Sequence, residues 1–217
     1  MTPSAAPPRS DESTRARMIS AAVECILEEG YYRASSNRIA QRAGVTWGVI
    51  QYHFGSREAL LLAVLERAAD HLQQTLEAAH IPAGSLEDRL VALAEVVWSY
   101  YGQPQFLAYI QVMLNLSHDP STEQQTRDAI RENQLHVSHH LPRVLQEALG
   151  EDVPANHRKA AAIRNFVFAA LRGLAIDQAH IAALPRDTKV DPRQHLSERT
   201  MLVRALALQV AASMARP

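Results

Sequence analysis

The sequence predicts an all-α protein, and three observations support this. Apolar residues recur at helical spacing along most of the 217 residues. Gly and Pro breakers separate these segments, and the alternating runs typical of strands are missing. A hydrophobic content of 47% with 21% charged residues is typical of a globular protein with a sizeable core. We therefore expect about nine helices, in a small three-helix domain followed by a larger helical domain.

The first helix is expected over residues 14–29, closed by Gly30. One apolar stripe at i, i+3, i+4, i+7 and i+8 defines it, formed by Ile19, Ala22, Val23, Ile26 and Leu27. Cys25 lies off this stripe, and core packing is favoured over a redox role because no cationic cluster neighbours it in sequence. Residues 1–13 are rich in Pro, Ser and Ala and are predicted to form a disordered arm.

Two short helices joined by a tight turn are expected next. Ser35 can cap the first helix, and Gly44 follows it where a left-handed residue ends a helix without Cβ strain. Thr46 can cap the second helix, and Gly48 is useful there if another backbone must approach closely. This order of elements is that of a helix-turn-helix, which places its second helix in the DNA major groove.

These residues resemble the TetR family of bacterial transcriptional regulators. The segments that carry the resemblance are Ile39-Ala40, Ala43-Gly44-Val45-Thr46-Trp47-Gly48, Ile50, His53-Phe54 and Ser56-Arg57-Glu58-Ala59-Leu60. Gln51 stands where the family usually has a Tyr, with Tyr52 beside it, so that one phosphate contact is in doubt. The resemblance implies a helix-turn-helix DNA-binding domain over residues 14–58 and a ligand-binding and dimerisation domain over residues 59–217.

A set of residues in this segment is predicted to contact DNA: Ser35, Arg38, Arg42, Thr46, Trp47, Gly48, Val49, Tyr52, His53 and Arg57. Trp47, Val49 and Thr46 suit base readout. The resemblance implies phosphate contacts for Tyr52, His53 and Arg57, which would position the helix without carrying sequence information. Two alternatives stay open: Trp47 folds back onto its own domain, and Arg38 and Arg42, four residues apart, form a solvated face.

The charge balance limits the function classes. The formal net charge is −1, with seven basic and six acidic side chains in residues 1–58 and fifteen against seventeen thereafter. An architectural DNA-binding protein is expected to be strongly basic, so the near-neutral net charge argues against this alternative. A small all-α enzyme is a second alternative, but the sequence contains no Gly-x-Ser-x-Gly, Walker loop or His-Glu-x-x-His. No catalytic residue, cofactor or metal is expected.

Beyond residue 55 the breakers delimit long helices. The expected helices cover residues 56–80, 85–101, 105–116, 121–149, 155–183 and 196–215. Pro142 should kink or split the helix that contains it, because it removes a backbone donor and clashes with the preceding turn. No apolar run of about 18 residues could span a bilayer, and no disulfide can form within the chain, so we expect a cytoplasmic protein without a membrane partner.

Five of the twelve aromatic residues lie between residues 98 and 109, and they suggest a small-molecule pocket. The predicted effector-binding residues are Trp98, Tyr101, Phe106, Met113, His136, Asn165 and Phe168. The alternative is ordinary core packing at helical spacing. His136 and His140 share a helical face with the spacing of metal ligands, but no carboxylate or Cys lies close by in sequence to complete a site.

Small and apolar residues on the last two helices predict a dimer interface, because small residues let helices approach closely and two helices from each protomer can form a four-helix contact about a two-fold axis. The predicted interface residues are Ala162, Phe166, Ala170, Gly173, Leu202, Leu206 and Val210. The sequence thus predicts a ligand-responsive transcriptional regulator. We expect it to act as a repressor that binds a pseudo-palindromic double-stranded operator as a homodimer and is released by a small hydrophobic or amphipathic effector.

Overall fold

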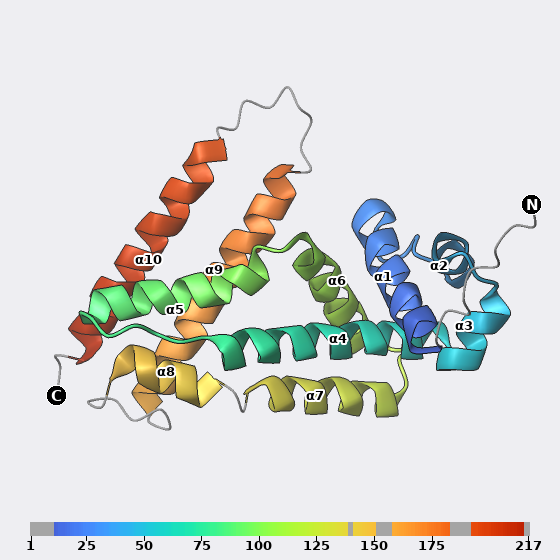
Figure 1. Ribbon diagram of the computed structural model, residues 1–217, viewed down its shortest axis with the longest axis horizontal. Helices are drawn as coiled ribbons and strands as arrows, with labels where there is room; N and C mark the ends of the chain where they lie inside the picture. The colour runs from blue at the N-terminus through green and yellow to red at the C-terminus, as the bar shows by residue number, and fades with distance from the viewer. Residues whose placement is uncertain (1–10, 139–140, 151–157, 183–191, 215–217) are drawn as a thin grey trace, which may run out of the picture. The chain divides into compact units, whose positions relative to one another are not determined.

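The computed structural model describes residues 11–138, 141–150, 158–182 and 192–214. Ten helices and their connecting turns make up this part of the chain (Figure 1): α1 (Asp11–Glu29), α2 (Ser36–Ala43), α3 (Trp47–Phe54), α4 (Arg57–Ala78), α5 (Leu86–Tyr101), α6 (Pro104–His118), α7 (Gln124–Ser138), α8 (Leu141–Leu149), α9 (Arg158–Ala182) and α10 (Pro192–Met214). The described residues contain no strand, so the predicted all-α class is confirmed.

The helix count differs from the expected nine because residues 121–149 form two helices, α7 and α8, rather than one. Pro142 is the second residue of α8. A proline in the first turn of a helix leaves no bond unmade, since that N–H has no partner within the helix, whereas inside a continuous helix it would remove a bond. Of the two effects predicted for Pro142, a kink or a split, the structure shows the split.

The chain divides into two compact units. Unit 1 comprises Met1–Ala68 and Ala108–Asn133, and unit 2 comprises Ala69–Leu107 and Gln134–Pro217. Helices α4, α6 and α7 contribute residues to both units. The boundary predicted between residues 58 and 59 stays a prediction.

Unit 1 is built around the apolar face of α1. Four of the five stripe residues, Ile19, Ala22, Val23 and Ile26, are buried, and Leu27 packs partly buried against the same core. Buried side chains of α2, α3, α4 and α6 complete this core, among them Ile39, Ile50, Leu60, Leu61 and Val112. Cys25 is fully buried here, and burial raises the pKa of its thiol, which agrees with the packing interpretation.

Unit 2 is arranged around α5, which packs against α8, α9 and α10. Helix α5 begins with a capping box, because Ser85 accepts a bond from the Asp88 backbone N–H and Asp88 accepts one from the Ser85 backbone N–H. Arg89 of α5 donates from Nε to the Ala148 carbonyl oxygen at the end of α8, 3.0 Å away. Buried leucines of α5, α8 and α9 fill the interior: Leu93, Leu145, Leu149 and Leu171.

The end of α4 is also fixed within unit 2. Arg143 of α8 donates to the carbonyl oxygens of Leu76, Glu77 and Ala79. Carbonyls of the last helical turn have no partner within their own helix, so a guanidinium that binds two of them, and the Ala79 carbonyl just beyond, caps it. In the described residues, no helix has both the length and the apolar composition needed to cross a membrane.

Candidate nucleic-acid interface

Helices α2 and α3 and the turn between them form a helix-turn-helix. The Ser35 hydroxyl accepts a hydrogen bond from the Arg38 N–H at 3.4 Å, as an N-cap should. Gly44 ends α2 at φ +66°, and the Val45 N–H donates to the Ala40 carbonyl oxygen at 3.0 Å. A residue with a Cβ is strained at this φ, so glycine is what allows the chain to turn here.

Each helix of the motif buries only one or two residues fully in the core of unit 1. In α2 the buried residues are Ile39 and Ala40, and in α3 the buried residue is Ile50. Trp47 and Val49 are partly buried against the same core. Trp47 is therefore neither fully exposed nor fully folded back, because it packs partly on its own domain and partly stays at the surface.

The start of α3 has features that suit a close approach to DNA. Thr46 occupies the N-cap position but its side chain makes no cap bond, contrary to the predicted cap. Gly48 is exposed, and a Cβ added to it would meet, within 4 Å, the Thr46 hydroxyl at 3.7 Å. Tyr52 is 81% exposed, and its ring lies 5.2 Å from that of the half-buried His53. Helix α3 thus presents a hydroxyl, a glycine and a phenol on the surface.

The two arginines of α2 are paired with glutamates of α1. Arg38 Nε lies 2.9 Å from a Glu29 carboxylate oxygen, and Arg42 Nη1 lies 2.7 Å from one of Glu28. The bond from Arg42 holds the pKa of Glu28 below its usual value. Arg42 is also 3.5 Å from Glu24. These pairs fasten α2 to α1, a role that the sequence analysis missed although Glu24 and Glu28 share one face of the first helix.

Arg57 is bonded to the turn that precedes α2. Its Nε donates to the Ala34 carbonyl oxygen at 3.1 Å and its Nη2 to that of Tyr31 at 2.8 Å. The guanidinium carbon also lies 4.8 Å from the centroid of the Tyr31 ring. Arg57 therefore positions this turn, and the predicted phosphate contact of the same side chain stays a prediction.

Residues 18–64 match the family model of the bacterial regulatory proteins, tetR family. The HTH-type transcriptional activator FasR of Mycolicibacterium smegmatis is 34% identical over 89 residues. Residues 18–64 thus form a DNA-binding domain of the kind found in the TetR family of bacterial transcriptional regulators. The match covers 41% of this chain and 41% of FasR, so the chain spans about two fifths of the length of that relative. Members of the family regulate transcription and are not enzymes, as predicted for this chain.

Solved structures extend the likeness to most of the chain. The transcriptional regulator SCO7518 of Streptomyces coelicolor has a TM-score of 0.57 and 25% identity, covering 90% of this chain and 96% of its own. The regulator FadR of Bacillus subtilis, in complex with stearoyl-CoA, has a TM-score of 0.62 and 19% identity, covering 88% and 97%. The likeness to FadR concerns the fold alone.

Three of the predicted effector residues lie together in unit 2. The Tyr101 ring centroid is 4.6 Å from that of Phe106 and 6.2 Å from that of Phe168. All three side chains are buried, and Arg172 Nη2 donates to the Tyr101 hydroxyl at 3.3 Å. Tyr100 extends this cluster, with its ring 5.9 Å from Phe106. The geometry is that of an aromatic core with a polar edge.

The other predicted effector residues do not join this cluster. Met113 packs against the core of unit 1. Asn165 is exposed and its side-chain oxygen accepts a bond from Arg164, while Trp98 is half-buried on α5. The side chain of His136, and residues 139–140 with the other two histidines of the predicted metal alternative, lie outside what the structure describes.

The predicted dimer residues divide into exposed and buried groups. On α9, Ala162, Phe166 and Gly173 are exposed and Ala170 is half-buried. On α10, Leu202 is half-buried, whereas Leu206 and Val210 are buried within unit 2 itself. The large exposed apolar side chains of the two helices are Phe166, Ile176, Met201 and Leu208. The last three were missed because periodicity alone does not say which face of α9 or α10 turns inward.

Proposed function

We propose that this TetR-family regulator is a cytoplasmic, homodimeric repressor that binds a pseudo-palindromic operator and releases it when a small hydrophobic or amphipathic effector binds. The observation that carries the proposal is the capped α2–turn–α3 motif. Its second helix keeps Thr46, Gly48 and Tyr52 at the surface. Such a helix enters the major groove with its amino-terminal residues near the base edges.

The DNA contacts follow from this placement. The exposed part of Trp47, with Val49 and the Thr46 hydroxyl, is proposed to contact base edges, where apolar contacts read the thymine methyl group. Gly48 leaves room for the DNA backbone. Tyr52 and His53 are proposed to contact phosphates, which fixes the register of the helix without reading sequence. Ser35, Arg38, Arg42 and Arg57 complete the proposed contact set.

The dimer is proposed to form through α9 and α10. Phe166 and Ile176 are exposed on α9, and Met201 and Leu208 lie seven residues apart on one face of α10. Large apolar side chains gathered on two neighbouring helices are typical of a protein interface. In a dimer that binds successive major grooves, the two recognition helices would lie about 34 Å apart, one turn of DNA.

The effector is proposed to bind at the aromatic cluster of Tyr101, Phe106 and Phe168. The cluster is apolar and has the Tyr101 hydroxyl and Arg172 at its edge, which suits a ligand with an apolar body and a polar group. The complex of FadR with stearoyl-CoA is an example of an amphipathic ligand on the same fold. Since α4 contributes residues to both units, a ligand-driven shift of α4 would alter DNA binding.

Fluorescence separates the two binding events, because the chain has two tryptophans. In a Trp47→Phe background, the emission of Trp98 should change as acyl, steroid-like or drug compounds are titrated. The same compounds should release operator DNA, and both curves should give one affinity by linkage. A compound that releases DNA while Trp98 stays silent, and whose action survives Phe168→Ala, would place the effector site elsewhere.

Repression is tested separately with a reporter gene whose promoter overlaps the operator found by binding-site selection. We expect the protein to lower expression and an active effector to restore it. Higher expression in the presence of the protein would contradict repression and would leave the DNA-binding proposal standing.

A further inference from the structure

A surface pocket of unit 1 is separate from the aromatic cluster proposed for the effector. It has a volume of about 530 Å³, within the range of roughly 300–1,000 Å³ that is usual for small-molecule sites. One wall is Tyr32, in the turn between α1 and α2, and the other is the end of α6 with the residues that follow it. The lining residues are Tyr32, Leu114, Asn115, His118, Asp119 and Pro120.

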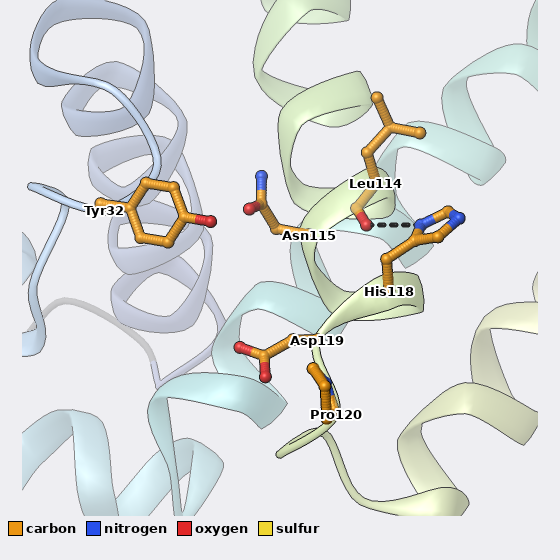
Figure 2. Close-up of a pocket in the computed structure, with 6 residues that line it drawn as sticks. All are labelled: Tyr32, Leu114, Asn115, His118, Asp119 and Pro120. Carbon is orange, nitrogen blue, oxygen red and sulfur yellow. Dashed lines mark hydrogen bonds between the residues drawn. The ribbon is translucent and has the colours of Figure 1, made fainter.

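The polar groups of the pocket are mainly hydrogen-bond acceptors. Figure 2 shows the Tyr32 hydroxyl directed toward the Asn115 amide, with the Asp119 carboxylate on the same side of α6. Asn115 uses its Nδ2 to donate to the Gln111 carbonyl oxygen at 2.8 Å, which leaves its oxygen as an acceptor. His118 is turned back onto its own helix, with Nδ1 2.9 Å from the Leu114 carbonyl oxygen.

Asp119 supplies a fixed negative charge at this site. Its Oδ1 accepts bonds from the Ser121 hydroxyl at 2.7 Å and from the Ser121 N–H at 2.8 Å. These bonds hold the pKa of Asp119 below its usual value, so the carboxylate is ionised at neutral pH. Arg127 lies near, and it donates to the carbonyl oxygens of Asp119, Pro120 and Thr122, which holds this turn in shape.

The apolar part of the lining is well exposed. The Tyr32 side chain is 85% exposed and Leu114 is 49% exposed. An aromatic ring and an aliphatic side chain beside a carboxylate suit a ligand that carries a cationic head and an apolar body, since the ring face also attracts cations. A ligand carboxylate or phosphate would instead meet Asp119 as a like charge.

We propose that the pocket formed by Tyr32, Asn115 and Asp119 is a second ligand site, which binds a small amphipathic primary ammonium compound. The ammonium donates to the Asp119 carboxylate and to the Asn115 and Tyr32 oxygens, and its apolar body lies along Leu114 and the Tyr32 ring. The three N–H donors of a primary ammonium match in number these three acceptor groups of the pocket.

This site acts on the turn that leads into the helix-turn-helix. The neighbouring Tyr31 N–H donates to the Gln111 side-chain oxygen of α6 at 3.3 Å, and Arg57 binds the carbonyls of Tyr31 and Ala34. Ser35, the N-cap of α2, follows this turn directly. A ligand that joins Tyr32 to Asp119 adds a further link between the turn and α6, so its binding should be coupled to DNA affinity. This coupling rests on the proposed function, whereas the binding itself does not.

The test uses the full chain and two probes of nearly the same shape, phenethylammonium and the neutral 2-phenylethanol, in titrations followed by calorimetry and by amide NMR. Phenethylammonium should bind at least about tenfold more tightly than 2-phenylethanol, because a charge-assisted hydrogen bond is lost in the alcohol. The largest amide shifts should fall in residues 31–35 and 114–121.

Two variants and a control complete the design. Asp119→Asn keeps the Oδ1 acceptor for Ser121 and removes the charge, and Tyr32→Leu removes the ring. Each variant should bind phenethylammonium about tenfold or more weakly than wild type does. Asp70→Asn makes the same change in net charge on the exposed face of α4 and should leave the affinity unchanged. Equal affinity for the two probes, equal affinity across the variants, or shifts confined to unit 2 would overturn the site.

Operator binding is then measured with and without phenethylammonium. A shift in operator affinity that disappears in Asp119→Asn supports the coupling. Ligand binding with the expected variant profile but no change in DNA affinity would retain the site and overturn its coupling. If no operator is found, the proposed function fails while the titrations still decide the site.

Discussion

Helices α2 and α3 differ from helices α9 and α10 in what they leave at the surface. The short pair buries three residues and exposes hydroxyl, glycine and phenol groups, and its arginines are paired with α1. The long pair exposes large apolar side chains, with Met201 68% and Leu208 69% exposed. The first surface suits a charged, hydrated partner and the second suits another protein surface. This difference supports the proposal that α2 and α3 bind DNA and that α9 and α10 bind a second copy of the chain.

The largest effect is expected from a charge on the apolar surface. Leu208→Glu should convert dimers into monomers and abolish operator binding, because a buried unpaired carboxylate costs roughly 3–5 kcal/mol and the symmetry mate repeats the cost. Gly173→Glu on α9 should do the same, and a Cβ there meets nothing within 4 Å of its own chain. Light scattering measures the oligomeric state of each variant, and operator titrations measure its DNA binding. Leu135→Glu, at an exposed leucine of α7, is the control and should stay dimeric.

Arg57→Ala tests what holds the helix-turn-helix in place. Loss of the guanidinium leaves the half-buried carbonyls of Tyr31 and Ala34 without this donor, so the free energy of unfolding should fall by about 1–3 kcal/mol. If Arg57 also contacts a phosphate, the salt slope of DNA binding falls by about one unit for all sequences. An unchanged slope with the expected loss of stability would remove Arg57 from the DNA contacts and keep its positioning role.

Trp47→Ala tests base readout on the polar surface. The variant should lose sequence preference at one or two positions in each half-site, costing on the order of 1–3 kcal/mol there. Binding-site selection measures this change. Tyr52→Phe is the matched comparison and should weaken binding to all sequences alike, because a phosphate contact carries no sequence information. The same selected sequences for Trp47→Ala and wild type would contradict base readout.

The smallest effect is expected from the Arg42–Glu28 pair, since both side chains reach solvent and water screens them. The pKa of Glu28 is lowered in the folded state, so the pair stabilises the fold fully above the ordinary value of 4.5 and loses this contribution as the pH falls through the lowered pKa. The stability difference between wild type and Glu28→Gln should therefore shrink on acidification. A difference that grows in acid would contradict this sign.

The sequence predicted most helices and the Ser35 cap because their signals are local, whereas the predicted Thr46 cap was wrong. The stripe from Ile19 to Ile26, the Ser35 cap and the Gly44 turn each depend on residues within one or two helical turns. The bonds of Arg57 to Tyr31 and Ala34 span more than twenty residues, so spacing could not reveal them. The pocket at Tyr32 likewise joins a turn to a helix more than eighty residues later. The outward faces of α9 and α10 depend on which side packs against α5.

The cap that Arg143 places on α4 has a consequence for local unfolding. Without such a cap the last helical turn frays, and its amide protons exchange with solvent ahead of the rest of the helix. Here one guanidinium holds the carbonyls of Leu76 and Glu77 and that of Ala79 just beyond the helix, so the final amides of α4 should exchange at the rate of its middle turns. A helix of 22 residues is about 33 Å long. The guanidinium cap should therefore keep α4 helical up to its last turn.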